Sequence, residues 1–245
     1  MLLKTAPPPA SIQSVQAPEL RGAELAAVYY GERTGGDFYD FLRVSPERVV
    51  FGLLDVAGRK QENLAVVAAA QQAFRTGAVE LLAAEDINEA EAMIELALRL
   101  NRAVIEASAD VHACPAFAGC YNESSGIVSY FNAGHTPALL RDGGGIVELP
   151  ATGLPLGLFS HVTSDAKIAA LTAGAVLTLV SRGVVEARDR REEMGLAGVK
   201  ARLQDCRAAS AKEFCLDQID NLRQFMRRPP THNDVTVMSL LRFGD

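Results

Sequence analysis

Short apolar segments that follow one another without a helical pattern between them restrict the folds open to the middle of this chain. Four such segments occupy residues 116–121, 127–132, 137–141 and 146–149. The sequences AsnGluSerSerGly and AspGlyGlyGly, which separate two pairs of them, consist of residues that favour tight turns. The pattern predicts antiparallel hairpins, with the three glycines at 143–145 at a hairpin tip.

Helical patterns flank this region on both sides. The sequence predicts one helix over about 62–84 and an amphipathic second one over 86–108, which opens with Asp86 and Glu89 at the spacing of a capping box. A third helix is expected to start near Ser210, with Glu213 three residues on, and to end before the prolines at 229 and 230.

Further strands are predicted from short apolar runs bounded by turn residues. They cover residues 23–30, 48–56, 175–182 and 235–241. The segment ThrGlyGlyAspPheTyrAsp, residues 34–40, is expected to be a turn, and the proline-containing residues 1–20 an extended N-terminal arm or the remnant of a linker.

The order of these elements favours an α+β fold. Helices follow helices and strands arrive in hairpin groups, so we expect sheets packed on each other or on helices rather than alternating βαβ units. The glycines at 143–145 do not form a dinucleotide-binding motif, because they lack the GxGxxG spacing and no helical pattern follows them.

Composition excludes several classes of function. The 245 residues are 49% hydrophobic, which is enough for a large core, and 24 basic against 30 acidic residues give a net charge of −6. This balance favours neither a nucleic acid nor an anionic membrane as partner. The basic run at 188–191 is interrupted by Asp189 and is interpreted as a solvated turn.

Cysteines and the N-terminal residues indicate the compartment. The four cysteines form no CxxC motif, which argues against a zinc site and for reduced, buried thiols. The start of the sequence has too short an apolar stretch for a signal peptide or a membrane span. We therefore expect a cytoplasmic location.

Carboxylates at strand ends or in glycine-rich turns are the candidates for chemistry, because a rigid strand can hold them around a metal ion. Three places qualify: Asp37 and Asp40 in GlyGlyAspPheTyrAsp, Asp55 at the end of an apolar strand, and Asp234 before the last strand. An isolated aspartate at such a position is more often a turn or cap residue, but three places occur together.

Six motifs then occur in one order along the chain. They are GlyGlyAspPheTyrAsp (35–40), LeuLeuAspValAlaGlyArg (53–59), AsnAlaGlyHisThrPro (132–137), GlyLeuProLeuGlyLeu (153–158), SerArgGlyValValGluAlaArg (181–188) and AsnAspValThr (233–236). This series resembles the metal-dependent PPM-type serine/threonine protein phosphatases, specifically their bacterial SpoIIE/RsbU branch. The resemblance runs from about Arg21 to Phe243, so residues 21–245 are expected to form a single domain of that kind.

The resemblance implies a fold, a cofactor and a substrate class. The fold is an α-β-β-α sandwich in which two antiparallel sheets hold a binuclear Mn²⁺ or Mg²⁺ centre. The metals activate a water for attack on a phosphoserine or phosphothreonine, without a covalent phosphoenzyme. Substrates in this branch are typically phosphorylated anti-sigma-factor antagonists of the STAS type. Residues matched to metal binding are Asp37, Asp55 and the carbonyl of Val56, with Asp234 as an additional candidate.

Two of the four expected metal-binding acids are replaced. Where active relatives have ThrAspGly, this chain has Ser181, Arg182 and Gly183, and where they have AspAsp it has Asn233 and Asp234. The family's four carboxylates carry a charge of −4, whereas two aspartates, one arginine and one asparagine carry −1. A guanidinium about 4 Å from a divalent ion repels it by roughly 8 kcal/mol at an effective dielectric constant near 20.

These replacements leave three hypotheses open. In the first, Arg182 takes the vacated metal position, contacting Asp55 and also Asp37 through its forked guanidinium, and the domain is a pseudophosphatase that binds a regulatory protein. In the second, Arg182 turns to solvent and Asp234 or a water completes a weaker Mn²⁺ or Mg²⁺ site of an active phosphatase acting on a STAS-type protein. In the third, the fold is an assembly platform whose old cleft is unused.

Other candidate side chains carry less weight. His135 lies in AsnAlaGlyHis, which in this family is mainly a structural turn, so we expect no catalytic residue beyond the metal site. His112, His161 and His232 have no partner pattern, and Cys120 lacks the matched histidine and asparagine of a cysteine nucleophile. The sequence does not fix the oligomeric state, the regulatory input or the role of the arm.

Overall fold

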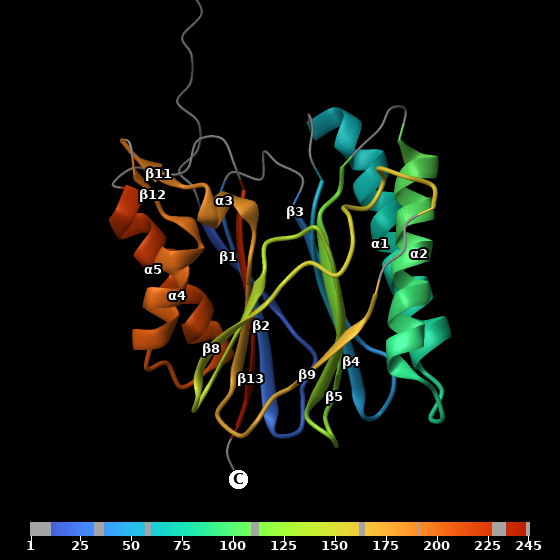
Figure 1. The fold of residues 1–245 in the computed structure, drawn as a ribbon, viewed down its shortest axis with the longest axis horizontal. Coiled ribbons are helices and arrows are strands. Elements are labelled where there is room, and N and C mark those ends of the chain that lie inside the picture. The colour runs from blue at the N-terminus through green and yellow to red at the C-terminus, as the bar shows by residue number, and fades with distance from the viewer. Residues whose placement is uncertain are drawn as a thin grey trace, which may run out of the picture.

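The computed structural model describes residues 11–31, 37–56, 60–108, 113–161, 165–190, 192–226 and 234–243. Two antiparallel sheets pack face to face and helices cover both outer faces, so the fold is an α-β-β-α sandwich (Figure 1). The expected fold class is confirmed.

One sheet has five strands in the order β3-β4-β5-β6-β9. Its strands are β3 (Asp37–Arg43), β4 (Arg48–Asp55), β5 (Ala116–Asn122), β6 (Ile127–Ala133) and β9 (Lys167–Ala170). All neighbours are antiparallel, and short turns join β3 to β4 and β5 to β6. This sheet carries the two carboxylates of main interest, because β3 begins with Asp37 and β4 ends with Asp55.

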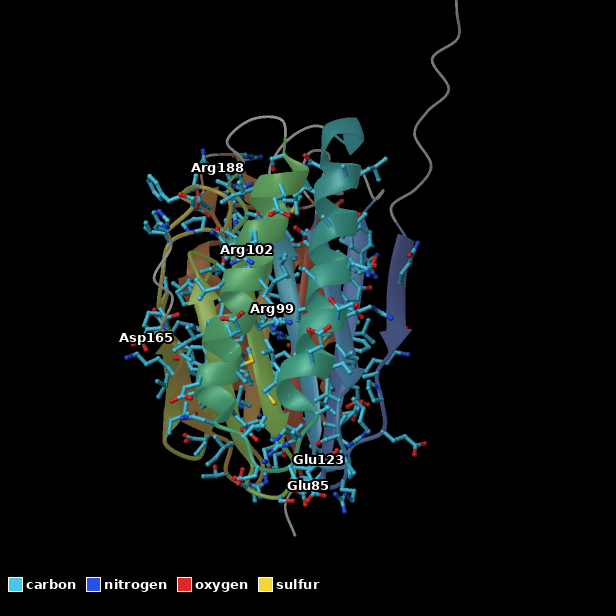
Figure 2. All side chains as sticks on the ribbon, turned by 90° about the vertical axis from the view of Figure 1, so that its right-hand side faces the viewer. Glu85, Arg99, Arg102, Glu123, Asp165 and Arg188 are labelled. Carbon is cyan, nitrogen blue, oxygen red and sulfur yellow. The ribbon has the colours of Figure 1, made fainter. Side chains whose placement is uncertain are left out.

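The other sheet has six strands in the order β1-β2-β13-β10-β7-β8. Its strands are β1 (Ser11–Gln16), β2 (Ala23–Gly31), β7 (Ala138–Asp142), β8 (Gly145–Leu149), β10 (Val176–Val180) and β13 (Val235–Arg242). The hairpin of β7 and β8 turns at the three glycines, as the sequence predicts. Figure 2 shows β1 at the outer edge of this sheet.

Five helices and a small hairpin complete the described part of the chain. The helices are α1 (Lys60–Leu82), α2 (Glu89–Ala107), α3 (Arg182–Val185), α4 (Gly195–Asp205) and α5 (Ala211–Met226). Helices α1 and α2 cover the five-stranded sheet, and α4 and α5 cover the six-stranded one (Figure 1). Strands β11 (Arg188–Asp189) and β12 (Glu192–Glu193) form an exposed hairpin between α3 and α4.

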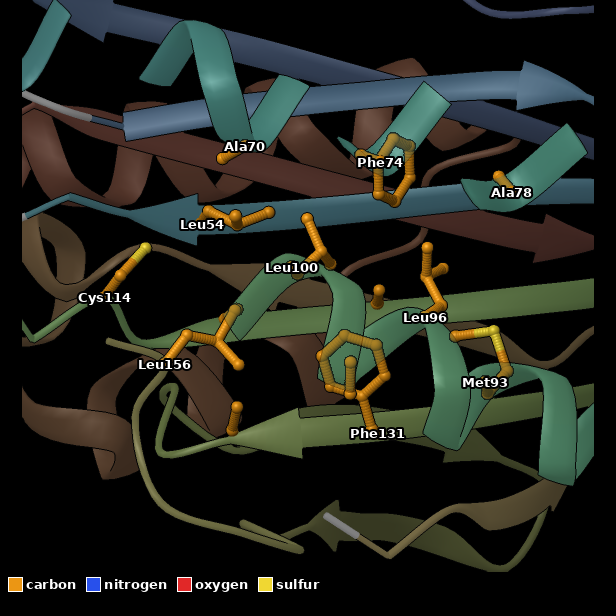
Figure 3. Close-up of a cluster of buried hydrophobic side chains, with 14 of the residues drawn as sticks. Leu54, Ala70, Phe74, Ala78, Met93, Leu96, Leu100, Cys114, Phe131 and Leu156 are labelled. Atoms are coloured by element: carbon orange, nitrogen blue, oxygen red, sulfur yellow. The ribbon is translucent and has the colours of Figure 1, made fainter. Parts of the chain in front are cut away.

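Alternation of side chains along the strands builds three apolar layers. On β4, Phe51 and Leu53 point between the sheets, whereas Val50 and Leu54 point toward α1 and α2. Figure 3 shows Leu54 in the helix-side layer with Phe74 of α1 and Leu100 of α2. Because a residue of β4 faces the opposite way from its neighbour, Asp55 shares the inter-sheet side with Leu53.

Some predicted boundaries are wrong for local reasons. The segment expected to turn at 34–40 becomes strand β3 from Asp37 onward, because β4 supplies a pairing partner along its whole length. The cap of α2 is Asn88, whose side chain accepts from the backbone N–H groups of Ala90 and Glu91, rather than Asp86. Strand β10 stops at Val180, and the chain turns into α3 where the sequence predicts strand up to residue 182.

Several elements had no signal in the sequence analysis. Strand β1 lies within the proline-containing segment interpreted as an arm and pairs with β2 over its full length. Strand β9 and helix α4 were also not predicted from the sequence. Strand β9 is short, and α4 is only weakly amphipathic. The prolines expected to end α5 lie outside the described residues, and α5 itself ends at Met226.

A buried amide in α5 leads to a stability prediction. Gln218 is 1% exposed, and neither polar atom of its side chain has a hydrogen-bond partner among the described residues. We expect Gln218→Met to raise the free energy of unfolding by about 1–2 kcal/mol, because an unpaired buried polar group is replaced by an apolar one of similar shape. Urea unfolding measures the change, with Gln71→Met on the exposed side of α1 as control. A loss of stability specific to Gln218→Met would contradict the prediction.

Among the helices of the described residues, none is both long and apolar enough to cross a membrane.

Candidate metal centre

Asp37 and Asp55 lie directly opposite each other at one end of the five-stranded sheet. They are Cα partners in the antiparallel register of β3 and β4. Directly opposed residues project to the same face of a sheet. Both carboxylates therefore point between the sheets, at the end of the sandwich that carries α3 (top of Figure 1).

Asp40, the second acid of the segment GlyGlyAspPheTyrAsp, has a different role. It lies three residues after Asp37 and so projects from the opposite face of β3, toward α1. There it accepts two hydrogen bonds from the guanidinium of Arg75, from Nε at 2.6 Å and from a terminal nitrogen at 2.9 Å. Asp40 therefore fastens α1 to the sheet and is not part of the candidate centre.

Arg182 lies beside Asp55. Its Nε atom is 3.1 Å from Asp55 Oδ2 and 3.8 Å from Glu186 Oε1, and its side chain is 48% exposed. The contact with Asp55 runs through Nε, so the structure does not show the two-pronged contact onto Asp55 and Asp37 that the first hypothesis pictured. The guanidinium nevertheless places a positive charge next to Asp55, one of the two carboxylates matched to metal binding.

Asp37 is held by a hydroxyl group of the facing sheet rather than by a cation. Thr236 Oγ1 on β13 donates to Asp37 Oδ2 at 2.9 Å. Burial and the nearby charge of Asp55 raise the pKa of Asp37 to about 8, although the hydrogen bond from Thr236 opposes the rise. Asp37 is therefore a carboxyl group that the metal-free fold keeps protonated at mildly acidic pH.

Asp55 experiences opposing influences. Burial raises its pKa, the charge of Arg182 lowers it, and Glu186 and Asp234 raise it, with a net upward direction. The ion pair with Arg182 therefore does not fully compensate for the removal of the carboxylate from water.

Asp234 is engaged by β2. The Tyr29 hydroxyl donates to Asp234 Oδ1, and the carboxylate is 7% exposed. The hydroxyl of Ser181 donates to the backbone carbonyl of Asp234 at 3.3 Å and accepts from Thr236 N at 3.0 Å. Asn233, the substituted position before it, lies outside the described residues.

The carbonyl of Val56, the backbone group matched to metal binding, also has a partner within the protein. Asn63 of α1 donates to it from Nδ2 at 2.9 Å, and Asn63 is 2% exposed. Neither Asn63 nor Tyr29 was identified from the sequence, because asparagine and tyrosine near an acid carry no spacing signal of their own.

His135 is part of a turn beside the sheet. Its backbone N–H donates to Asn132 Oδ1 at 2.8 Å, and its Nδ1 lies 3.1 Å from the carbonyl of Thr136. Burial and the charge of Arg182 lower the pKa of His135 to about 4, so the ring is neutral at physiological pH. Cys120 lies in the helix-side core, where burial raises the pKa of its thiol, so it has no nucleophilic character. His161 is exposed, and His112 and His232 lie outside the described residues.

These residues do not fit a binuclear metal centre. Within the part of the chain that the structure describes, no three His, Cys, Asp or Glu side chains form a group that could hold a metal ion. The oxygens matched to metal binding accept instead from protein donors or pair with Arg182: Asp55 with Arg182, Val56 with Asn63, and Asp37 with Thr236. The arrangement is a polar cluster held together by internal donors and one guanidinium.

Comparison with known proteins gives the family context. The family model described as Stage II sporulation protein E (SpoIIE) matches residues 45–243. A search of the curated proteins finds no match.

Solved structures share the fold. The RsbU and RsbW domains of a Mycobacterium tuberculosis protein align with 24% identity and a TM-score of 0.74, over 94% of this chain and 64% of theirs. The PP2C phosphatase domain of SpoIIE from Bacillus subtilis, with a fragment of its regulatory domain, aligns with 15% identity and a TM-score of 0.74, over 95% and 71%. RsbX, crystallised in complex with magnesium, aligns with 15% identity and a TM-score of 0.62, over 94% and 99%. This chain thus spans less than two thirds of the first of these chains.

Proposed function

The chain belongs to the SpoIIE family of PPM-type phosphatase domains of bacterial signalling, and from this premise we propose that it is a catalytically impaired member that acts by binding a regulatory protein. Residues 21–245 would act as one such domain in the cytoplasm, with strand β1 (Ser11–Gln16) as an edge strand of its six-stranded sheet. The partner would be a STAS-type anti-sigma-factor antagonist, phosphorylated or not.

The observation that carries this proposal is the ion pair between Arg182 and Asp55. In the family, acidic residues at this end of the sandwich hold the metals that activate the attacking water. Here Arg182 Nε lies 3.1 Å from Asp55 Oδ2, so the positive charge at that carboxylate comes from the protein itself. A divalent ion added at about 4 Å from the guanidinium would be repelled by roughly 8 kcal/mol at an effective dielectric constant of 20.

The residues of this polar cluster then have structural roles. Arg182 balances Asp55, Thr236 holds the Asp37 carboxyl group, and Tyr29 holds Asp234. None of them is suited to generate a hydroxide at neutral pH: burial lowers the pKa of the His135 ring to about 4, which makes it a weak base, and its Nδ1 lies at the Thr136 carbonyl. The surface of a phosphatase domain is kept while its hydrolytic step is weakened.

The alternative is an active Mn²⁺- or Mg²⁺-dependent phosphatase acting on a phosphoserine or phosphothreonine of a STAS-type protein. The exposure of Arg182 favours it, since a side chain that is 48% exposed has room to turn away from Asp55. Asp37, Asp55, the Val56 carbonyl and Asp234 would then hold the metal. Arg182 would have to leave, and Asn63 and Tyr29 would have to share or release their acceptors.

A single set of samples tests the proposal. We expect calorimetric titration of the purified protein with Mn²⁺ to show no tight uptake, and the same samples to hydrolyse neither an aryl phosphate nor a phosphoserine peptide above the rate without protein. Binding of a phosphorylated or unphosphorylated STAS protein without turnover would support the proposal. Metal uptake with turnover would establish the alternative, and binding of partners only at surfaces away from this polar cluster would indicate an assembly platform.

A further inference from the structure

Asn63 makes an unusual contact for a residue of the first turn of a helix. It is the fourth residue of α1, and its side chain reaches back to the carbonyl of Val56, at the end of β4. The amide is buried, whereas the next residue, Leu64, is 62% exposed on the outer side of the helix. Asn63 therefore points into the strand-to-helix connection, next to the candidate centre.

The neighbouring backbone position carries the other internal donor. Asp55 pairs with Arg182 from α3, and Val56, the next residue, accepts from Asn63 of α1. The two donors thus approach adjacent residues from different elements of the fold. Both present N–H groups to oxygens that would otherwise face a cation.

We propose that Asn63 is a second positioning residue of this polar cluster, and that its hydrogen bond to Val56, together with the ion pair of Arg182 and Asp55, competes with a divalent ion for these oxygens. This inference rests on the proposed function and extends it: exclusion of metal is divided between a charge on α3 and an amide on α1. A divalent ion that replaces Arg182 still meets a carbonyl already bonded at 2.9 Å by a buried amide. The ion must weaken that hydrogen bond to reach the carbonyl oxygen, so the bond competes with metal binding.

The first test uses the otherwise unchanged protein. We expect Asn63→Ala to lower the melting temperature by a few degrees, because the buried Val56 carbonyl loses its donor. Mn²⁺ should not restore that loss, since Arg182 still opposes the ion. Full recovery of the melting temperature with Mn²⁺ would overturn the division of roles between the two residues.

The second test measures Mn²⁺ affinity by calorimetry in a background from which the opposing charge has been removed. We compare Arg182→Asp/Asn233→Asp with the same protein carrying Asn63→Ala. The inference predicts about tenfold tighter Mn²⁺ binding when the amide is absent, because the ion no longer competes with a buried hydrogen bond. Equal affinities, or no uptake by either protein, would overturn it.

Asn101→Ala is the matched control. Asn101 of α2 is 3% exposed, donates from Nδ2 to the Phe159 carbonyl at 3.0 Å and accepts from Gly157 N at 2.8 Å, so its removal also deprives a backbone carbonyl of an amide donor. We expect it to lower stability without changing Mn²⁺ affinity. Different results would overturn the two proposals. Mn²⁺ uptake with turnover by the unmodified protein would overturn the proposed function, whereas equal Mn²⁺ affinities with and without Asn63 would overturn only this inference.

Discussion

Mn²⁺ is expected to bind the double variant Arg182→Asp/Asn233→Asp at least about a hundredfold more tightly than it binds the unmodified protein, a difference of roughly 3 kcal/mol. The two substitutions remove the positive charge that lies 3.1 Å from Asp55 and add two carboxylates at positions that hold metal in the family. The Coulomb term alone is larger, at roughly 8 kcal/mol for an effective dielectric constant near 20. We expect less because Arg182 is half-exposed and solvent screens its charge.

Calorimetry with Mn²⁺ measures this affinity, and thermal unfolding with and without Mn²⁺ gives an independent readout through ligand linkage. Arg188→Asp is the control for charge, because Arg188 is an exposed arginine paired with Glu193 in the β11–β12 hairpin. It changes the net charge as Arg182→Asp does, but away from the polar cluster. If the double variant takes up no more Mn²⁺ than this control, the fold does not present residues 182 and 233 as the family does.

Asp37→Asn should stabilise the metal-free protein at neutral and alkaline pH. The folded state raises the pKa of Asp37 from 3.8 to about 8, so between these values it holds a proton that the unfolded chain has lost. Stability therefore falls as pH rises through this window, and the loss is complete above about pH 8. Asparagine cannot ionise, so the variant lacks this loss, and its Oδ1 can still accept from Thr236.

Urea unfolding in EDTA at pH 5 and pH 8 measures the effect. We expect the free energy of unfolding of the variant to exceed that of the wild type by about 2–4 kcal/mol at pH 8, and by much less at pH 5. The full effect of the pKa shift would be roughly 1.4 kcal/mol per pH unit. We expect less than this because Asp37 is partly exposed to solvent. Asp40→Asn is the control, and its free energy of unfolding should change in the opposite direction. It removes the charged partner of Arg75 and should therefore lower stability. A gain at pH 8 no larger than that at pH 5 would contradict the prediction.

The sequence predicted most of the strands because each repeats a local signal. The segments that became β2, β4, β5, β6 and β13 are short apolar runs bounded by turn residues, and the glycines at 143–145 mark the tip of the β7–β8 hairpin. Strand β3 was missed because its pairing with β4 outweighs the turn propensity of the glycines before it. The cap of α2 was misplaced because Asp86 and Asn88 both carry capping side chains, and the chain geometry before Glu89 selects between them.

For the candidate centre, the ordered motifs and the two substitutions were visible in the sequence, but the partners of the surviving oxygens were not. Tyr29, Asn63 and Thr236 come from β2, α1 and β13 and meet Asp234, Val56 and Asp37 only in the folded chain. The residues of the first and third of these hydrogen bonds lie 205 and 199 positions apart, a separation that leaves no periodicity or spacing for sequence analysis to find. Asn63 and Val56 lie only 7 positions apart, but no motif links them.

The amino-acid sequence by itself determined the family and the sandwich fold, and it has Arg182 and Asn233 where the family resemblance leads us to expect acids, since these points depend on motif order, alternation and residue identity. Tertiary structure alone decided that Asp40 faces α1 while Asp37 faces the second sheet, and that Arg182 turns toward Asp55. The physical reason is that side-chain direction on a strand follows pairing register, and that the interactions of a buried charge depend on which donors packing brings within a few ångströms.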